Sequence, residues 1–447
     1  MVITAEAALV SLQQGQISAV ELLQLYLERI KQREPLVGAW ETLDLDSALQ
    51  QAQRCDAAQA AGQPLAPLHG IPIGIKDTFA TRDFPTSWGT PIHAGQQLGY
   101  DAAVVERLRA AGAMILGKTV TTEYALARPN KTRNPHNLEH TPGASSSGSA
   151  AAVADGMVPV AIGTQMVGSI LRPAAYCGIL GFKPSFGTIS RYGLMPSCRE
   201  LDHVGIFAHT VADIQRTLKV LAAADPRDPD CYGTLAPSSP SPTPPKLALI
   251  LEPHASWLES EAKAALLETA TALAAAGAII TEIGLPPEFT THFEQINVLA
   301  AASMAANHGA DYDRCADQMS PKLRQVIEEG RRISAITYAQ ARQAAVAYTL
   351  YLSKLWPDID AILTPVTTGT APHGLENTGS PIFCALWTLC GLPAIAIPVR
   401  TASNGLPLAI QLVAARLRDF DLLALTDWVM GCLSTHPLSN HAHYRLH

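Results

Sequence analysis

The sequence predicts an α/β fold: a single large domain with a mixed, mainly parallel β-sheet covered by helices on both faces. First, short apolar runs alternate with longer amphipathic stretches along the whole chain. Second, the runs at 361–366, 394–399 and 408–414 are mostly apolar, which is typical of strands covered on both faces. Third, a chain of 447 residues with 48% hydrophobic and 16% charged residues can form a large core.

The elements follow from periodicity and from their end signals. A capping box from Ser18 to Glu21 opens the second helix of the helical region 4–33. The proline-rich segment 232–245 is expected to be a surface loop or a boundary between two lobes. Strands are also predicted at 71–75, 113–117, 157–163, 247–251 and 278–284. Further helices are predicted at 46–61, 101–111, 149–156, 211–223, 258–275, 288–308, 321–356 and 419–432.

Charge and composition exclude several classes of protein. A net charge of -7 without a basic cluster argues against a nucleic-acid partner, and no apolar run is long enough to cross a membrane. The start of the chain is amphipathic rather than a signal peptide, and the eight cysteines are scattered, which favours a cytoplasmic protein with reduced thiols. Four histidines in the tail 436–447 are better explained by a frayed terminus than by a metal, so no metal or cofactor is predicted.

One motif is misleading. Residues 112–119, GAMILGKT, match the P-loop pattern of nucleotide-binding proteins. A P-loop must follow a strand and open a helix, whereas the four variable positions here are apolar and read as the strand itself. We therefore expect Lys118 not to bind a nucleotide.

The chain is organised around residues 141–184, where loops rich in glycine and serine surround apolar segments. Loop 143–149 precedes a short helix, and loop 164–169 follows the strand 157–163. Ligands of open α/β sheets bind at the carboxyl ends of the strands, so these serines suit a nucleophile surrounded by backbone donors. Structural turns are the alternative. Lys76 closes the strand 71–75 and is either a surface residue with a buried stem or a desolvated base.

Several motifs, in order, resemble those of the amidase signature family. The segments are GIPIGIKD (70–77), AGAMILGKTVTTEYA (111–125), GASSSGSAAAVA (143–154) and GTQMVGSILRPA (163–174). The resemblance implies one amidase signature domain over 1–447, with the signature core at about 67–210. It also implies a triad of Lys76, Ser145 after a cis peptide bond, and the nucleophile Ser169. The backbone N–H groups of the loop with Met166, Val167 and Gly168 would bind the oxyanion. Ser146 would order the loop or contact the substrate.

The sequence departs from the family pattern without losing a reacting group. Gln165 stands where the family has Asp and Leu171 where it has Arg, so both members of a charge pair are replaced together. Ala144 and Val167 each replace a glycine.

The resemblance implies a hydrolase that acts on the C–N bond of a linear, small-molecule amide. Two other functions stay open. One is the A-type subunit of a glutamine-dependent amidotransferase, which supplies ammonia to a partner. The other is a catalytically silent binding protein on the same scaffold. Self-association into a homodimer also stays open.

Overall fold

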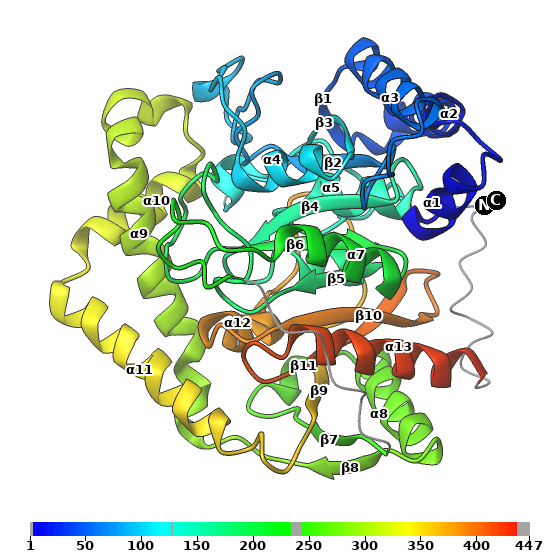
Figure 1. Ribbon diagram of the computed structural model, residues 1–447. Coiled ribbons are helices and arrows are strands. Elements are labelled where there is room, and N and C mark those ends of the chain that lie inside the picture. The colour runs from blue at the N-terminus through cyan, green and yellow to red at the C-terminus, as the bar shows by residue number, and fades with distance from the viewer. Residues whose placement is uncertain (1–2, 127, 234–243, 436–447) are drawn as a thin grey trace.

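A computed structural model describes residues 3–126, 128–233 and 244–435. Positions 234–243 of the predicted proline-rich loop and the histidine-bearing tail 436–447 lie outside this range. Within the described residues, one eleven-stranded sheet runs through the molecule in the order β1-β3-β2-β4-β6-β5-β10-β11-β9-β7-β8 (Figure 1). The strands are β1 Trp40–Leu43, β2 Pro72–Lys76, β3 Met114–Thr119, β4 Val160–Gln165, β5 Leu180–Lys183, β6 His203–Ala208, β7 Lys246–Leu249, β8 Ile279–Glu282, β9 Ala361–Pro365, β10 Ala394–Thr401 and β11 Pro407–Val413.

The sheet is mixed, as predicted, but the expectation that it is mainly parallel is wrong. Strand β2 is parallel to β3 and β4, and β7 is parallel to β8 and β9. The other six neighbouring pairs are antiparallel. The reason lies in the connections: β5 and β6 are joined by the loop 184–202, and β10 and β11 by the turn 402–406. Antiparallel neighbours can be joined by such loops, whereas parallel neighbours need a crossover.

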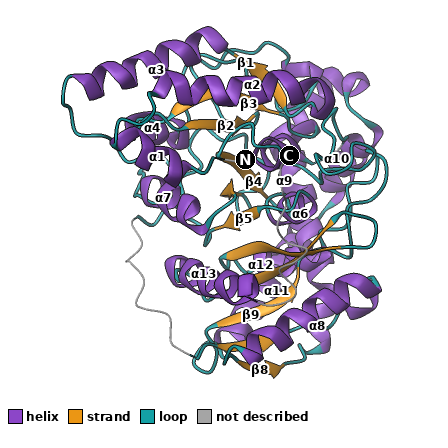
Figure 2. Ribbon diagram, turned by 90° about the vertical axis from the view of Figure 1, so that its right-hand side faces the viewer, coloured by secondary structure: helices purple, strands orange, loops and turns teal. Residues whose placement is uncertain are grey.

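Helices cover both faces of this sheet, as predicted. Helices α7 and α13 lie on one face and α6 on the other, which Figure 2 shows in side view. The helices are α1 Ala5–Gln13, α2 Ala19–Val37, α3 Leu45–Ala60, α4 Ala103–Ala110, α5 Ser147–Ala154, α6 Leu171–Tyr176, α7 Val211–Leu221, α8 Ser260–Ala275, α9 His292–Cys315, α10 Pro321–Arg332, α11 Ala335–Ser353, α12 Ile382–Leu389 and α13 Asp419–Thr435.

Capping residues determine where several helices begin. Ser18 Oγ accepts a hydrogen bond from the Glu21 amide at 3.1 Å, and the Glu21 carboxylate accepts one from the Ser18 amide at 2.8 Å. This confirms the predicted capping box at the start of α2. The predicted helix 321–356 is instead two helices, because Ser334 caps the N-terminus of α11 and interrupts the helix after α10.

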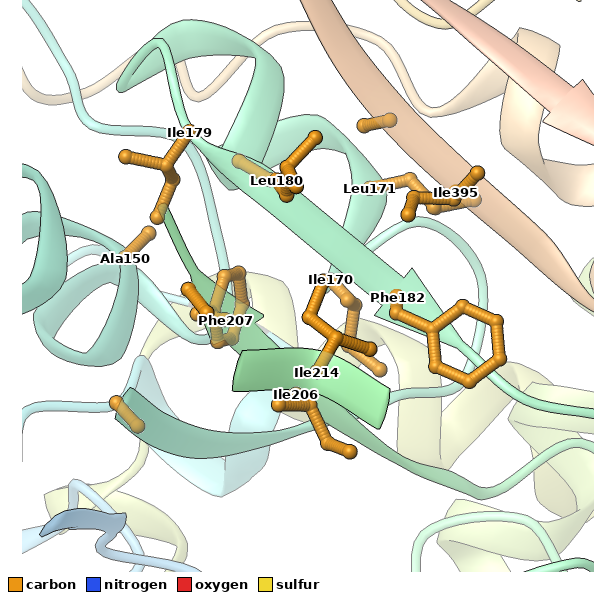
Figure 3. Close-up of a cluster of buried hydrophobic side chains, with 14 of the residues drawn as sticks. Ala150, Ile170, Leu171, Ile179, Leu180, Phe182, Ile206, Phe207, Ile214 and Ile395 are labelled. Atoms are coloured by element: carbon orange, nitrogen blue, oxygen red, sulfur yellow. The ribbon is translucent and has the colours of Figure 1, made fainter. Parts of the chain in front are cut away.

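The core fixes the segment that follows β4. Ile170 and Leu171 are fully buried at the start of α6. Ile170 lies beside Phe182 of β5 and Ile206 of β6, and Leu171 lies beside Ile395 of β10 (Figure 3). Gly205 makes room for this packing, since a Cβ atom there would lie 2.1 Å from Cδ1 of Ile170. The loop between β4 and α6 is therefore anchored in the core at its end.

Candidate active site

Lys76 ends β2 in the interior of the sheet, with β3 on one side and β4 on the other. Its side chain is fully buried, and Nζ donates hydrogen bonds to Ser145 Oγ and Thr164 Oγ1, both at 2.7 Å. Burial lowers the pKa of Lys76 well below its ordinary value, and the charge of Asp202 opposes this shift only in part. Of the two alternatives, the lysine is therefore the buried, desolvated one rather than a surface residue, while its role as a base stays a prediction.

Ser145 belongs to the loop that leads into α5. The Ala144–Ser145 peptide bond is cis, as the family resemblance implies. The Arg172 guanidinium donates a hydrogen bond to the Ala144 carbonyl at 2.9 Å, which holds this peptide in place from α6. Ser146 Oγ donates to the Thr164 carbonyl at 3.0 Å and accepts from the Thr164 amide at 3.2 Å, so Ser146 ties the loop to β4.

Gln165 links the beginning of the loop after β4 to its end by hydrogen bonds. Its Oε1 accepts hydrogen bonds from the amides of Ile170 at 2.7 Å and Leu171 at 3.0 Å. Its Nε2 donates to Thr388 Oγ1 at 2.9 Å, and Thr388 in turn donates to the Val167 carbonyl at 2.8 Å. A carboxylate could not donate to Thr388 in this way. The glutamine thus completes a neutral network, in agreement with the apolar Leu171 that replaces the arginine.

Ser169 follows this anchored loop and is 8% exposed. Gly168 beside it must lack a side chain, because a Cβ atom would lie 2.8 Å from Cβ of Pro381. Met166 and Val167 form the rest of the loop. Within the part of the chain that the structure describes, the Ser169 hydroxyl has no hydrogen-bond partner. The structure thus joins Lys76 to Ser145, while the contact between Ser145 and Ser169 stays a prediction.

Asp77 points away from Lys76, as strand alternation predicts. Its Oδ2 accepts hydrogen bonds from the Ser87 amide at 3.0 Å and from the Ser87 hydroxyl at 2.5 Å. Its Oδ1 forms an ion pair with Lys118 Nζ at 2.9 Å. Lys118 lies on β3, so residues 114–119 of the apparent P-loop are a strand, as predicted. Sequence reasoning missed the role of Lys118 as a counter-ion.

Two further residues of the centre were also missed. Thr164 lies two positions beyond Ile162 on β4, so the alternation of side chains along a strand places both on one face of the sheet. That alternation is the only signal in the sequence for the position of Thr164. Asp202 lies far away in sequence and carried no signal. Burial raises the pKa of Asp202 to about 7, although the amides of Ser197 and Cys198 donate hydrogen bonds to its carboxylate.

The structure also bears on metal binding and on membrane crossing. Among residues 3–126, 128–233 and 244–435, no three histidines, cysteines or carboxylates come together in a way that could hold a metal ion. Over the same ranges, no helix has the length and apolar character that crossing a membrane requires.

Comparison with known proteins places the chain in a family. The family model described as Amidase matches residues 21–423. The chain belongs to this amidase signature family. Among curated relatives, it is 36% identical to the A-type subunit of glutamyl-tRNA(Gln) amidotransferase from Symbiobacterium thermophilum over 464 aligned positions, covering 94% of this chain and 95% of the relative. It is 34% identical to the protein of the same name from Synechococcus sp. strain WH7803, covering 91% and 92%.

Solved structures share the fold over nearly the whole chain. A crystal structure described as an amidase has a TM-score of 0.87 at 28% identity, covering 96% of this chain and 99% of the other. A 6-aminohexanoate cyclic dimer hydrolase has a TM-score of 0.85 at 25% identity, covering 98% of each chain. The A-type subunit of glutamyl-tRNA(Gln) amidotransferase from Thermotoga maritima has a TM-score of 0.77 at 27% identity, covering 91% and 90%. Both hydrolases and amidotransferase subunits therefore share this architecture.

Proposed function

We propose that this protein cleaves the C–N bond of an amide through an acyl-enzyme on Ser169. The observation that carries the proposal is the contact of 2.7 Å between Lys76 Nζ and Ser145 Oγ in a fully buried position. A buried lysine whose partners among the described residues are hydroxyls rather than a carboxylate is stabilised in its neutral form, and a neutral amine can accept a proton.

The proposed reaction has two halves. Ser169 Oγ attacks the amide carbon while its proton passes to Ser145, whose own proton passes to Lys76. The backbone N–H groups of the loop 166–169 stabilise the oxyanion. The intermediate then collapses, the C–N bond breaks, and the relay returns the proton to the leaving amine. A water molecule next attacks the acyl ester by the same relay, which releases the carboxylic acid and restores Ser169.

A second function has the same chemistry but a different use of the product. The curated relatives are named as amidotransferase subunits, and this favours an A-type subunit that takes ammonia from glutamine for a partner protein more than it favours a free-standing hydrolase. The hydrolase is supported by the shared fold of the amidase and the cyclic dimer hydrolase.

The first experiment tests the acyl-enzyme. A fluorophosphonate should label the protein once, at Ser169, and Ser169→Ala should lose both labelling and amide cleavage. Ser147→Ala is the matched control, because Ser147 begins α5, directly after the loop that carries Ser145, and its buried hydroxyl has no hydrogen-bond partner among the described residues. Labelling that persists in Ser169→Ala would refute the nucleophile.

A second experiment separates the two functions. The isolated chain is given a panel of aliphatic, aryl and carboxylated amides, and release of ammonia or amine is measured. Turnover of a panel amide by the chain alone supports the hydrolase. Release of ammonia from glutamine only after a partner protein is added supports the amidotransferase function.

A further inference from the structure

A separate cavity of about 590 Å³ lies at the same edge of the sheet as Lys76. Its walls include Phe186 after the end of β5, Leu201 before the start of β6, Gly391 before the start of β10 and Arg416 after the end of β11. The antiparallel pairing brings these four strand ends to one edge. Neither Lys76 nor either serine loop lines it, so this cavity, the arginine groove, is distinct from the proposed catalytic centre.

One wall of the arginine groove is a face of α11. Its lining residues recur at helical spacing and are Arg342, Ala345, Val346, Thr349 and Leu350. Val346 is 59% exposed and Leu350 is 61% exposed, although both are large apolar side chains. The buried side chains of Leu299 and Leu389 continue the apolar surface inward. The groove therefore offers a substantial apolar area to a ligand.

Three arginines and two carboxylates line the groove, in a chain whose net charge is -7. Of the two carboxylates, Asp230 is already paired with Arg191 at 2.6 Å and Arg199 at 2.9 Å. Glu200 accepts a hydrogen bond from the Tyr338 hydroxyl at 2.6 Å.

Two arginines of the groove have no carboxylate partner among the residues that the structure describes. Arg342 forms no hydrogen bond or ion pair with any residue that the structure describes. Within the described ranges, Arg416 donates hydrogen bonds only to the Tyr232 hydroxyl at 3.1 Å and the Phe186 carbonyl at 3.5 Å, and it stacks over the Tyr232 ring. Two guanidinium groups are thus available to an anion at the rim of an apolar cavity.

We propose that the arginine groove binds an amphiphilic carboxylate: a small molecule with one anionic head and an apolar body. The head is bound by Arg342 and Arg416, since a guanidinium matches a carboxylate in shape and charge. The body covers Val346, Leu350 and the apolar floor. A neutral apolar ligand would leave the arginines without an anion, and an inorganic anion would leave the apolar wall uncovered. This inference does not depend on the proposed function, because the groove lies outside the catalytic centre.

The test is direct binding of 4-phenylbutyrate to the full-length protein, measured by calorimetry, with 4-phenylbutan-1-ol as the neutral probe. We expect saturable binding of the carboxylate and at least tenfold weaker binding of the alcohol. The double variant Arg342→Gln/Arg416→Gln should weaken carboxylate binding by at least tenfold. Arg54→Gln, at an exposed arginine of α3, is the matched control and should bind as the wild type does.

A variant of the apolar wall makes the test independent of the arginines. Val346→Glu places a negative charge at an exposed position of α11, so it should fold normally and weaken binding of the carboxylate more than of the alcohol. Equal affinity for the two probes, no saturable binding, or unchanged binding in both groove variants would overturn the proposal.

Discussion

Two buried lysines lie within the last two residues of neighbouring parallel strands, and they have different partners. Lys76 ends β2 and donates to two hydroxyls, those of Ser145 and Thr164. Lys118 on β3 pairs with the carboxylate of Asp77 at 2.9 Å and donates to the Thr86 hydroxyl at 2.7 Å. Both side chains are fully buried. The same residue type, at almost the same depth, thus has a neutral environment in one case and an ionic one in the other.

The comparison shows that the partner of a lysine, and not burial alone, decides what it can do. Burial lowers the pKa of both lysines, but for Lys118 the charge and hydrogen bond of Asp77 oppose the effect. For Lys76, the charge of Asp202 opposes the effect of burial, and among the described residues no carboxylate forms an ion pair with it. We therefore infer that Lys76 can act as a base, whereas Lys118 stays charged and holds Asp77 in place.

The largest expected effect comes from replacing the base with a permanent cation. Lys76→Arg should lower kcat by about 10³-fold or more, because arginine cannot give up its proton and general-base catalysis contributes roughly 10²- to 10⁴-fold. Turnover of a reactive aryl amide measures the effect, with circular dichroism to confirm folding. Lys118→Arg is the matched control and should keep activity in whatever fraction folds. A Lys76→Arg variant with most of its activity would mean that Lys76 is only a fixed charge.

Lys118→Met should instead affect stability. It leaves the buried Asp77 carboxylate without its cation, and breaking a buried pair in this way costs about 3–5 kcal/mol in the free energy of unfolding. Apart from Lys118, Asp77 Oδ1 has no hydrogen-bond partner among the described residues. The midpoint of urea unfolding measures the loss.

The control for this effect is the double variant Lys118→Met/Asp77→Asn, which removes both charges and should regain part of the lost stability. If Lys118→Met were as stable as the wild type, Asp77 would not depend on its counter-ion, and the contrast between the two lysines would fail.

Local patterns in the sequence predicted much of this arrangement. The apolar run before Lys76 indicated a strand that ends at the lysine, and the apolar residues 113–116 identified the false P-loop as a strand. The spacing from Ser145 to Ser169 came from the family resemblance, as did the cis peptide bond before Ser145.

What the sequence could not predict depends on distant partners. Lys118 and Asp77 meet only because β2 and β3 are neighbours in register. Neither segment alone specifies the order of the strands in the sheet. The direction of β5 and β6 depends on a long irregular loop, which carries no periodic signal. The arginine groove gathers residues from α11 and four strand ends, so no single segment could reveal it.

The pH dependence of kcat/KM tests whether Lys76, in contrast to Lys118, acts as a neutral base. If neutral Lys76 is the base, kcat/KM falls as pH falls through the pKa of Lys76, by about tenfold for each pH unit below it. Because burial lowers that pKa, the inflection should lie well below the ordinary lysine value of about 10.4. A profile measured on a substrate without ionisable groups tests this. An inflection near the ordinary lysine value would show that burial does not stabilise the neutral amine.

The smallest effect is expected from Thr164→Val, which keeps the shape of the side chain but removes the second hydroxyl partner of Lys76. One hydrogen bond is worth about 1 kcal/mol, so kcat should fall by roughly five- to tenfold. The same change makes the surroundings of Nζ more apolar, so the inflection of kcat/KM should move to lower pH. Thr121→Val is the matched control, because Thr121 is also buried and its hydroxyl has no hydrogen-bond partner in the described part of the chain. A fall in kcat without a shifted inflection would assign Thr164 to packing, and the hydroxyl environment that distinguishes Lys76 from Lys118 would then rest on Ser145 alone.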